Sequence, residues 1–170
     1  MNNGGTPTTT PASVPQIVRC DGAMLARYWP FLEEKLLIIK HKTDVAQRKA
    51  GLTQSQVTWT PQQIRFAVLK GLIGQNTVEL YLVMEGAEVL GFFVTSCPPD
   101  EFLQVPLVLH LWIAWSGKPR LLEQCEPFLK ELKRQRHCMV IQHTSGRQGW
   151  LRRNTPGWKL SQLIYRCEVD

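Results

Sequence analysis

The chain of 170 residues has no apolar run that approaches the roughly 20 residues of a transmembrane helix. It also lacks an apolar segment behind a basic start, so no export signal is expected. Its five cysteines are odd in number, widely spaced and without a Cys-x-x-Cys pair. This pattern argues against a disulfide framework and a zinc site and predicts reduced thiols. We therefore expect a soluble cytoplasmic protein with no metal and no membrane partner.

The first 15 residues carry no charged side chain and almost no large apolar group. Asn, Gly, Thr, Ser and Pro dominate them, and this composition does not bury enough apolar surface to offset the entropy of ordering. We predict a flexible leader over residues 1–15 and a single domain over residues 16–170. A chain of that length can bury a core without disulfides or a metal.

The net charge of +6 is unevenly placed along the chain. Between residues 107 and 170, eleven Lys and Arg stand against five Asp and Glu, whereas the other 106 residues carry nine of each sign. The C-terminal part of the chain therefore holds the whole excess, which suits an anionic ligand or partner. For the basic run over residues 130–136 alone, a solvated helix face is an equally good explanation.

A strand, a polar turn and a helix form the central unit of the sequence. Residues 105–115 are apolar and rich in β-branched and aromatic side chains, which predicts a buried strand. Residues 116–120 (Ser-Gly-Lys-Pro-Arg) follow as a polar segment, called the 116–120 turn below. Apolar positions then recur at helical spacing from Leu121, which predicts a helix to about residue 136. An anion can bind at the unpaired amides of a helix start, although an ordinary strand–helix turn has the same pattern.

The rest of the sequence predicts helices interleaved with strands. Thr60, Pro61 and Gln63 are a cap, a first-turn proline and a capping-box residue, which together indicate a helix start. Residues 41–57 are polar and without a period, and we interpret them as a mobile connection. The remaining expected elements are helices at 24–40, 60–72 and 146–153, a turn at 156–157, and strands at 16–20, 78–84, 88–97, 139–143 and 159–169. This order predicts an α+β (mixed α/β) fold with a mainly antiparallel sheet.

The element order, with its central strand–turn–helix unit, resembles the GNAT superfamily of N-acetyltransferases over about residues 16–170. The segment Met139-Val140-Ile141, then Leu151, Gly157-Trp158 and residues 165–168, is similar to the superfamily's late strand, short helix, Gly-aromatic turn and final strand. Residues 146–150 (Gly-Arg-Gln-Gly-Trp) resemble a signature of small GNAT-like proteins of tailed bacteriophages and prophages. The resemblance implies a twisted sheet with helices on both faces.

The same resemblance implies that acetyl-coenzyme A (acetyl-CoA) binds along the central strand. In the superfamily the strand backbone pairs with the pantetheine arm, which places Leu111, Ile113 and Trp115 beside it. The following turn and helix start wrap the pyrophosphate with backbone amides. The residues of this chain implied for that part are Ser116, Gly117, Lys118, Arg120 and Leu121.

The pyrophosphate pattern of the superfamily, Gln/Arg-x-x-Gly-x-Gly/Ala, falls here on residues 118–123 and departs from it. The bulky Leu121 and the acidic Glu123 occupy its two small positions. Pro119 removes one donor amide as well. The side chains of Lys118 and Arg120 are the expected phosphate ligands instead, in a degenerate and weak site.

Acetyl transfer to an amine needs a base for the ammonium and then an acid for the departing thiolate. His110 on the central strand is the best placed base, with His143 second. Strand alternation puts His110 on the face opposite Leu109, although a histidine there also fits a core or rim position. The resemblance places Arg152 where the superfamily often has an acidic tyrosine, and an arginine would stabilise a thiolate electrostatically rather than donate a proton.

Two functions from different classes stay open. The first is an acetyltransferase that uses acetyl-CoA and an amine of a protein or small molecule. The second is a catalytically inactive GNAT-fold phage protein that acts in virion assembly, as a virion component or as a host-protein-binding factor, in the host cytoplasm or the virion. Tryptophans lie among basic residues in the C-terminal part, a pattern that also suits stacking on nucleic acid, but core packing explains them and no nucleic-acid motif accompanies them.

Overall fold

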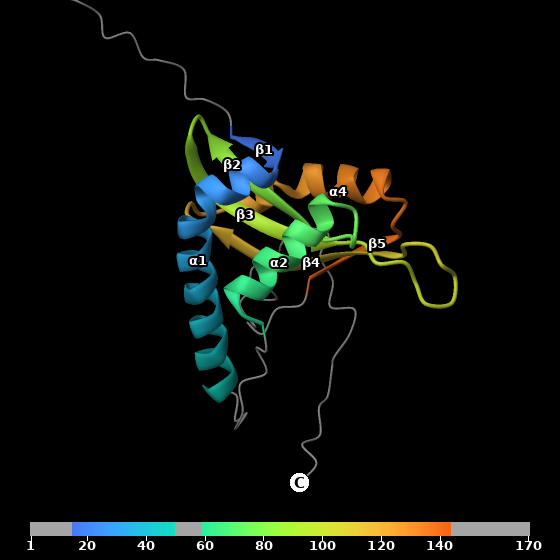
Figure 1. Ribbon diagram of the computed structural model, residues 1–170, viewed down its shortest axis with the longest axis horizontal. Helices are drawn as coiled ribbons and strands as arrows, with labels where there is room; N and C mark the ends of the chain where they lie inside the picture. Colours follow the sequence, from blue (N-terminus) through green and yellow to red (C-terminus); the bar gives the residue numbers. More distant parts are fainter. Residues whose placement is uncertain (1–14, 50–58, 144–170) are drawn as a thin grey trace, which may run out of the picture.

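The computed structural model describes residues 15–49 and 59–143, which form an α+β arrangement (Figure 1). Its elements in chain order are β1 (Gln16–Arg19), α1 (Gly22–Lys49), α2 (Pro61–Leu72), β2 (Glu79–Glu85), β3 (Glu88–Ser96), β4 (Val108–Ser116), α3 (Leu121–Gln124), α4 (Glu126–Gln135) and β5 (Val140–His143). The elements predicted at 146–153, 156–157 and 159–169 lie outside the described residues, as does nearly all of the predicted leader. None of the helices in the described part is long and apolar enough to cross a bilayer.

The five described strands form one sheet in the order β1-β2-β3-β4-β5. The pairs from β1 to β4 are antiparallel, and β4 and β5 are parallel. The parallel pair is possible because α3 and α4 carry the chain back between these two strands. This is the mixed, mainly antiparallel sheet that the sequence predicts.

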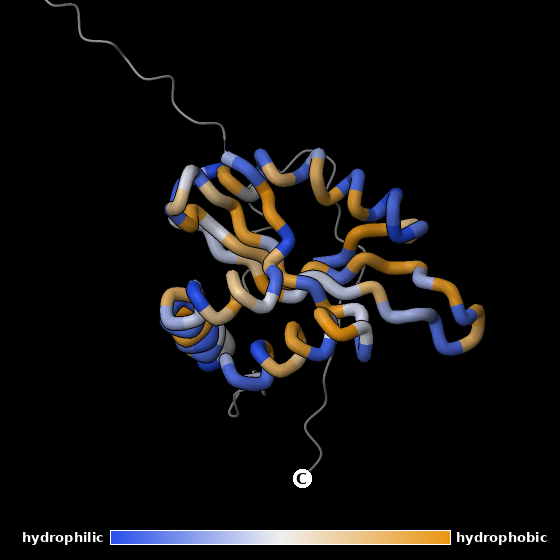
Figure 2. The backbone as a smooth tube through the Cα atoms, turned by 45° about the horizontal axis from the view of Figure 1, so that its top comes forward, coloured by the Kyte–Doolittle hydropathy of each residue, from blue (hydrophilic) through white to orange (hydrophobic). Residues whose placement is uncertain are grey.

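Helices cover both faces of the sheet, as expected. Figure 2 shows the strands, rich in apolar residues, between helices on either side. One apolar cluster joins α1 and α2 to the sheet around Leu32, Val68 and Phe92, and a second joins α3 and α4 to the opposite face around Phe93 and Leu129. Phe92 and Phe93 are neighbours in β3 and are 0% and 1% exposed, because successive strand residues point to opposite faces and both faces are covered here.

The helix α1 begins at Gly22, two residues before the predicted range, and is longer than predicted. The Met24 amide donates to Asp21 Oδ1 at 2.7 Å, which caps the first turn. The helix then continues to Lys49, so the interpretation of residues 41–49 as a mobile connection is wrong. These residues include Lys, Gln, Arg and Ala, which favour helix without an apolar stripe, and the Thr43 hydroxyl donates to Ile39 O at 2.9 Å.

The predicted start of α2 is confirmed in detail. The Gln63 amide donates to Thr60 Oγ1 at 3.2 Å, and Gln63 Oε1 accepts from the Thr60 amide at 2.8 Å. Pro61 fills the first helical position, where its missing amide hydrogen leaves nothing unpaired. The helix ends at Leu72, as expected from the glycines that follow.

The predicted hairpin of β2 and β3 is confirmed, with Gly86 at φ +60° in the turn between them. The central strand starts later than predicted, at Val108 rather than residue 105. Pro106 makes only an isolated bridge to Pro99, because a proline has no amide hydrogen to donate to a longer ladder. Residues 101–105, in the loop between β3 and β4, are exposed.

Candidate functional site

The strand β4 contains a bulge at Trp112, which sequence reasoning did not foresee. Val94 of β3 pairs with Ile113, but the next residue, Thr95, pairs with Leu111, so Trp112 has no partner in β3. The extra residue reverses the alternation of side chains along the strand. Leu111 packs with the α4-side cluster, whereas Ile113 packs with the α1-side cluster, and Trp112 is 44% exposed.

Beyond the bulge, β4 has one neighbouring strand in the described part of the chain. There β5 pairs with Val108–Leu111, a stretch called the paired half of β4 below. The stretch Trp112–Ser116 is called the open half: its residues from Ile113 onward pair with β3 on one side, and no described strand lies on the other. Backbone donors and acceptors along such an edge can pair with an extended ligand.

His143 is the last described residue of β5. It pairs with Leu111 in the ladder, and its Nδ1 lies 2.8 Å from Leu111 O, a geometry in which the imidazole N–H donates to the carbonyl. Burial lowers the pKa of His143, and the bond to Leu111 opposes part of that shift. The side chain therefore binds β4 next to the bulge.

The predicted base, His110, lies in the paired half and is half-buried. Its cross-strand neighbour on β3 is Ser96, so the two side chains share the face of α1 and α2. The Ser96 hydroxyl is buried and has no hydrogen-bond partner among the described residues. Burial lowers the pKa of His110 below its ordinary value. The imidazole is therefore neutral at pH 7 and able to accept a proton.

The 116–120 turn follows the open half directly and lies at the surface. Ser116 is half-buried and residues 117–120 are exposed. The Gly117 amide donates to Leu90 O at 2.9 Å, which anchors the turn to β3, and the Ser116 hydroxyl donates to Lys118 O. Arg120 adopts a left-handed φ of +60° immediately before α3. The turn therefore presents two cationic side chains beside the open edge.

One of these cations already has a partner. Lys118 Nζ lies 2.8 Å from Glu85 Oε2, and this hydrogen bond raises the pKa of Lys118. The ion pair is largely exposed, so it is weak and salt-sensitive, and a more highly charged anion can compete for the ammonium group. Lys118 and Arg120 thus fit a pyrophosphate, with Glu85 as a competitor on one side.

Two of the residues implied for the cofactor use their side chains for the core. The Trp115 ring lies 5.4 Å from that of Phe31, edge to face, and Leu121 is 2% exposed. A Cβ at Gly91 would lie 2.8 Å from Leu121 Cδ2, so Leu121 packs directly over that glycine. Trp115 and Leu121 therefore offer backbone groups, not side chains, to a ligand.

The helix predicted from Leu121 to about residue 136 is divided in two. α3 ends at Gln124 and α4 starts at Glu126, with Cys125 between them. Pro127 in the first turn of α4 cannot donate the hydrogen bond that a continuous helix requires. α3 has only four residues, so the partial positive charge at its start is small, and Glu123 in that turn adds a negative charge that disfavours a bound anion.

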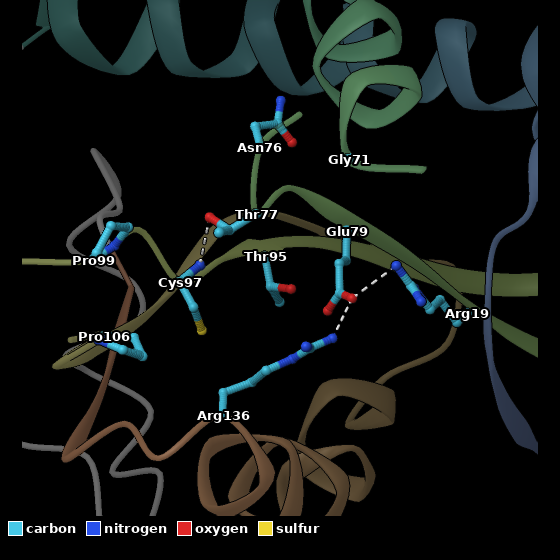
Figure 3. A pocket seen from close by; sticks show the side chains of 10 residues that line it. All are labelled: Arg19, Gly71, Asn76, Thr77, Glu79, Thr95, Cys97, Pro99, Pro106 and Arg136. Atoms are coloured by element: carbon cyan, nitrogen blue, oxygen red, sulfur yellow. Dashed lines mark hydrogen bonds and ion pairs between the residues drawn. The ribbon is translucent and has the colours of Figure 1, made fainter. Parts of the chain in front are cut away.

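A pocket of about 460 Å³ that the sequence did not predict lies at the other end of β3 (Figure 3). Glu79 at its centre accepts from Arg136 and lies 3.0 Å from Arg19. The Tyr81 hydroxyl also donates to Glu79, at 2.7 Å. The Glu79 carboxylate thus already has three partners, and two of them, Arg19 and Arg136, are distant in sequence, so no local motif could have indicated the cluster.

The structure brings most of the predicted site residues together on β4 and the turn that follows it. His110, in the paired half, precedes the predicted cofactor residues, which are Leu111, Ile113, Trp115, Ser116, Gly117, Lys118, Arg120 and Leu121. Arg152 lies outside the described residues. Within those residues, no cluster of three or more His, Cys, Asp or Glu is arranged to hold a metal ion.

Solved structures of acetyltransferases are similar to this chain. The aminoglycoside N-acetyltransferase AAC(6')-Iy in complex with CoA has 10% sequence identity and a TM-score of 0.60, over 96% of this chain and 98% of that chain. A GNAT family acetyltransferase of Staphylococcus aureus has 9% identity and a TM-score of 0.57, over 91% and 98%. A probable acetyltransferase has 16% identity and a TM-score of 0.58, over 91% and 98%.

No protein-family model matches the chain, and no curated protein sequence is significantly similar to it. Sequence identities this low indicate a shared fold but do not establish a shared activity. The matched structures nevertheless extend over nearly the whole of both chains. The chain therefore has the fold of the GNAT acetyltransferases, as its element order predicts.

Proposed function

We propose that this protein is an N-acetyltransferase that binds acetyl-CoA along the open half of β4 and transfers the acetyl group to an amine. The observation that carries the proposal is the continuity of the open half, Trp112–Ser116, whose second edge has no partner among the described strands, with an exposed cationic turn. The edge suits the amide-bearing pantetheine arm, and the turn suits the pyrophosphate. The similar structure of AAC(6')-Iy in complex with CoA supports this assignment.

The residues divide the binding of acetyl-CoA between backbone and side chains. Ile113 and Trp115 contribute strand backbone, because their side chains pack in the core. Leu111, also predicted for this role, pairs with both Thr95 and His143 and therefore lies at the end of the proposed site. Lys118 and Arg120 contribute charge, and Gly117 allows the backbone of the turn to approach the phosphates closely. The bulk of Leu121 and the charge of Glu123 make the expected affinity weak.

His110 is the proposed base for the amine. It is neutral at pH 7, and it lies in the paired half two residues before the bulge residue Trp112, close to the start of the open half. The base would take a proton from the ammonium form of the acceptor, directly or through a water molecule. Arg152 is the proposed stabiliser of the departing thiolate.

Calorimetric titration with acetyl-CoA tests the binding step. We expect a dissociation constant in the micromolar to millimolar range, with affinity about tenfold weaker in Lys118→Ala and in Arg120→Ala, because each removes a phosphate ligand. Lys130→Ala is the matched control, since Lys130 is an exposed lysine of α4 that is paired with Glu126. An absence of heat up to millimolar acetyl-CoA would exclude the proposal.

Transfer itself is measured as acetylated product by mass spectrometry. Aminoglycosides such as sisomicin are the first acceptors to test, because a similar structure is an aminoglycoside acetyltransferase in complex with sisomicin. His110→Gln should lower kcat about 100-fold and leave the affinity for acetyl-CoA unchanged. Equal losses of kcat and acetyl-CoA affinity would instead point to a structural role for His110.

A second candidate function is a GNAT-fold protein without catalysis, including a phage protein that acts in virion assembly, as a virion component or on a host protein. The observations in its favour are the Lys118–Glu85 ion pair and the buried Leu121 at a position that the superfamily reserves for a small residue. Its prediction is the opposite calorimetric result, no binding of acetyl-CoA, with co-purification of a phage or host protein.

A further inference from the structure

Two cysteines outside the proposed acetyl-CoA site lie sulfur to sulfur at the other end of the sheet. Cys97 directly follows β3 and Cys138 precedes β5, and their Sγ atoms are 3.3 Å apart. They are separated by 41 positions in the sequence, so the fold and not the local chain brings them together. Neither of the other described cysteines, Cys20 and Cys125, has a second thiol of the described part of the chain as a hydrogen-bond partner.

The position of the two thiols permits a covalent link. A disulfide needs sulfurs about 2 Å apart, so the required approach is little more than about 1 Å. Both residues lie just outside the regular strands, where a small backbone shift breaks no ladder hydrogen bond. Cys138 also follows His137, which has a left-handed φ of +56° in the turn after α4.

A small reagent can reach the pair from the pocket described above. Cys97 lines this pocket and is half-buried, whereas Cys138 is 6% exposed (Figure 3). Burial raises the pKa of the Cys97 thiol to about 12, and the hydrogen bond with Cys138 adds to that shift. The Cys97 thiol is therefore not intrinsically reactive. The feature that distinguishes this site is the adjacent Cys138 thiol, because a cysteine that has reacted with a reagent can then form a disulfide within the same molecule.

We propose that Cys97 and Cys138 form an oxidation site at which a small-molecule disulfide, RSSR, converts the two thiols into an intramolecular disulfide. One cysteine loses its proton to solvent and attacks a sulfur of RSSR, which yields a mixed disulfide and releases RS⁻. The second cysteine, also deprotonated, attacks the protein sulfur of the mixed disulfide, forms the Sγ–Sγ bond and releases the second RS⁻. The two RS⁻ groups take up protons, so two protein thiols are oxidised and RSSR is reduced to two RSH.

The link would enclose the whole of the proposed acetyl-CoA unit. β4, the 116–120 turn, α3 and α4 all lie between residues 97 and 138. The disulfide would tie the end of β3 to the start of β5 across the paired half of β4. The disulfide would hold the paired half of β4, from which the open half extends, in a fixed position. It would also reduce the conformational freedom of the unfolded chain.

Reaction of the full chain with hydroxyethyl disulfide tests the site, in a Cys167→Ser background so that the four described cysteines are the remaining thiols. We expect a product about 2 Da lighter than the reduced protein, with a Cys97–Cys138 peptide link, formed at least about tenfold faster than any modification of Cys20 or Cys125. The linked protein should unfold at a temperature on the order of 10 °C higher. Cys97→Ala and Cys138→Ala should each retain a mixed disulfide on the remaining cysteine.

Three results would overturn the proposal. The first is modification of Cys97 or Cys138 at the same rate as Cys20 and Cys125. The second is formation of the Cys97–Cys138 link only in denaturant, and the third is a linked protein that unfolds at a lower temperature than the reduced one. Because all three are measured on a chain that keeps Cys97 and Cys138, none depends on the folding of the Cys97→Ala or Cys138→Ala variant or on binding of acetyl-CoA.

Discussion

The two halves of β4 have opposite properties although they belong to one strand. The paired half has β3 on one side and β5 on the other, and Leu109 and Leu111 there are 1% and 3% exposed. Among the described strands, the open half has only β3 beside it, and Trp112 at its start is 44% exposed. The change occurs at one bulge residue. A strand can thus contribute to the core over half its length and keep its backbone available over the other half.

The largest difference between the halves should appear in stability. Leu109→Ala removes a fully buried side chain and should lower the free energy of unfolding by about 3 kcal/mol. Trp112→Ala in the open half should cost no more than about 1 kcal/mol, because much of that side chain is already in water. Urea unfolding measures both variants, and equal losses would show that the two halves do not differ.

The junction of the open half with β3 depends on a glycine. Gly91 pairs with Ser116, and a Cβ at Gly91 would lie 2.8 Å from Trp115 O, a backbone atom that cannot rotate away. Gly91→Ala should therefore cost about 2 kcal/mol of unfolding free energy. Gly22→Ala, where no atom lies within 4 Å of the added Cβ, is the control and should be neutral or slightly stabilising. A neutral Gly91→Ala would show that β3 and β4 adjust easily there.

The charge beside the open half should tune the affinity for acetyl-CoA, if the proposed function holds. Glu85→Gln frees Lys118 from its ion pair and should strengthen binding about threefold at low salt. Glu131→Gln, which removes a more exposed ion pair with Arg134 on α4, should leave the affinity unchanged. Calorimetry at two salt concentrations distinguishes the two variants. Equal affinities in both would remove Lys118 from the set of phosphate ligands.

The smallest expected effect concerns pH at the junction of the halves. Burial lowers the pKa of His143 in the folded protein below the ordinary value of 6.5, so the unfolded chain binds more protons in that range. Stability should be greatest above pH 6.5 and fall as the pH is lowered toward about pH 5. His143→Gln should reduce this dependence, measured by urea unfolding across that interval. His110, whose pKa is also lowered by burial, contributes in the same direction, and an unchanged pH profile in His143→Gln would assign the dependence to His110.

Local signals in the sequence predicted much of the fold. The Thr60 cap, the alternating strands around Gly86 and the apolar central strand each act over a few residues, and the structure has all three. The division between α3 and α4 also had a local signal, Pro127, which the helical spacing of the apolar residues concealed. The end of α1 had none, because residues that favour a solvated helix carry no apolar period.

The sequence predicted which segment of the chain forms the candidate site, but not how the residues of that segment are arranged in space. Element order located the strand, the turn and the two cations. The bulge at Trp112 depends on the register of β3 against β4, and a bulge residue of this kind carries no compositional mark. The ion pair of Lys118 with Glu85 and the contact of Cys97 with Cys138 join residues that are far apart in sequence, so only the tertiary structure reveals them.

The pairing of β1 has a consequence for the order in which the chain folds. β2, β3 and β4 follow one another and form a meander, with residues 86–87 and 97–107 as its two connections and no helix between the strands. β1 reaches the sheet only across both helices, since Gln16 pairs with Met84. Closing so long a loop is entropically costly before other contacts exist. The meander is therefore the natural nucleus, and the N-terminal strand joins a surface that is already in place.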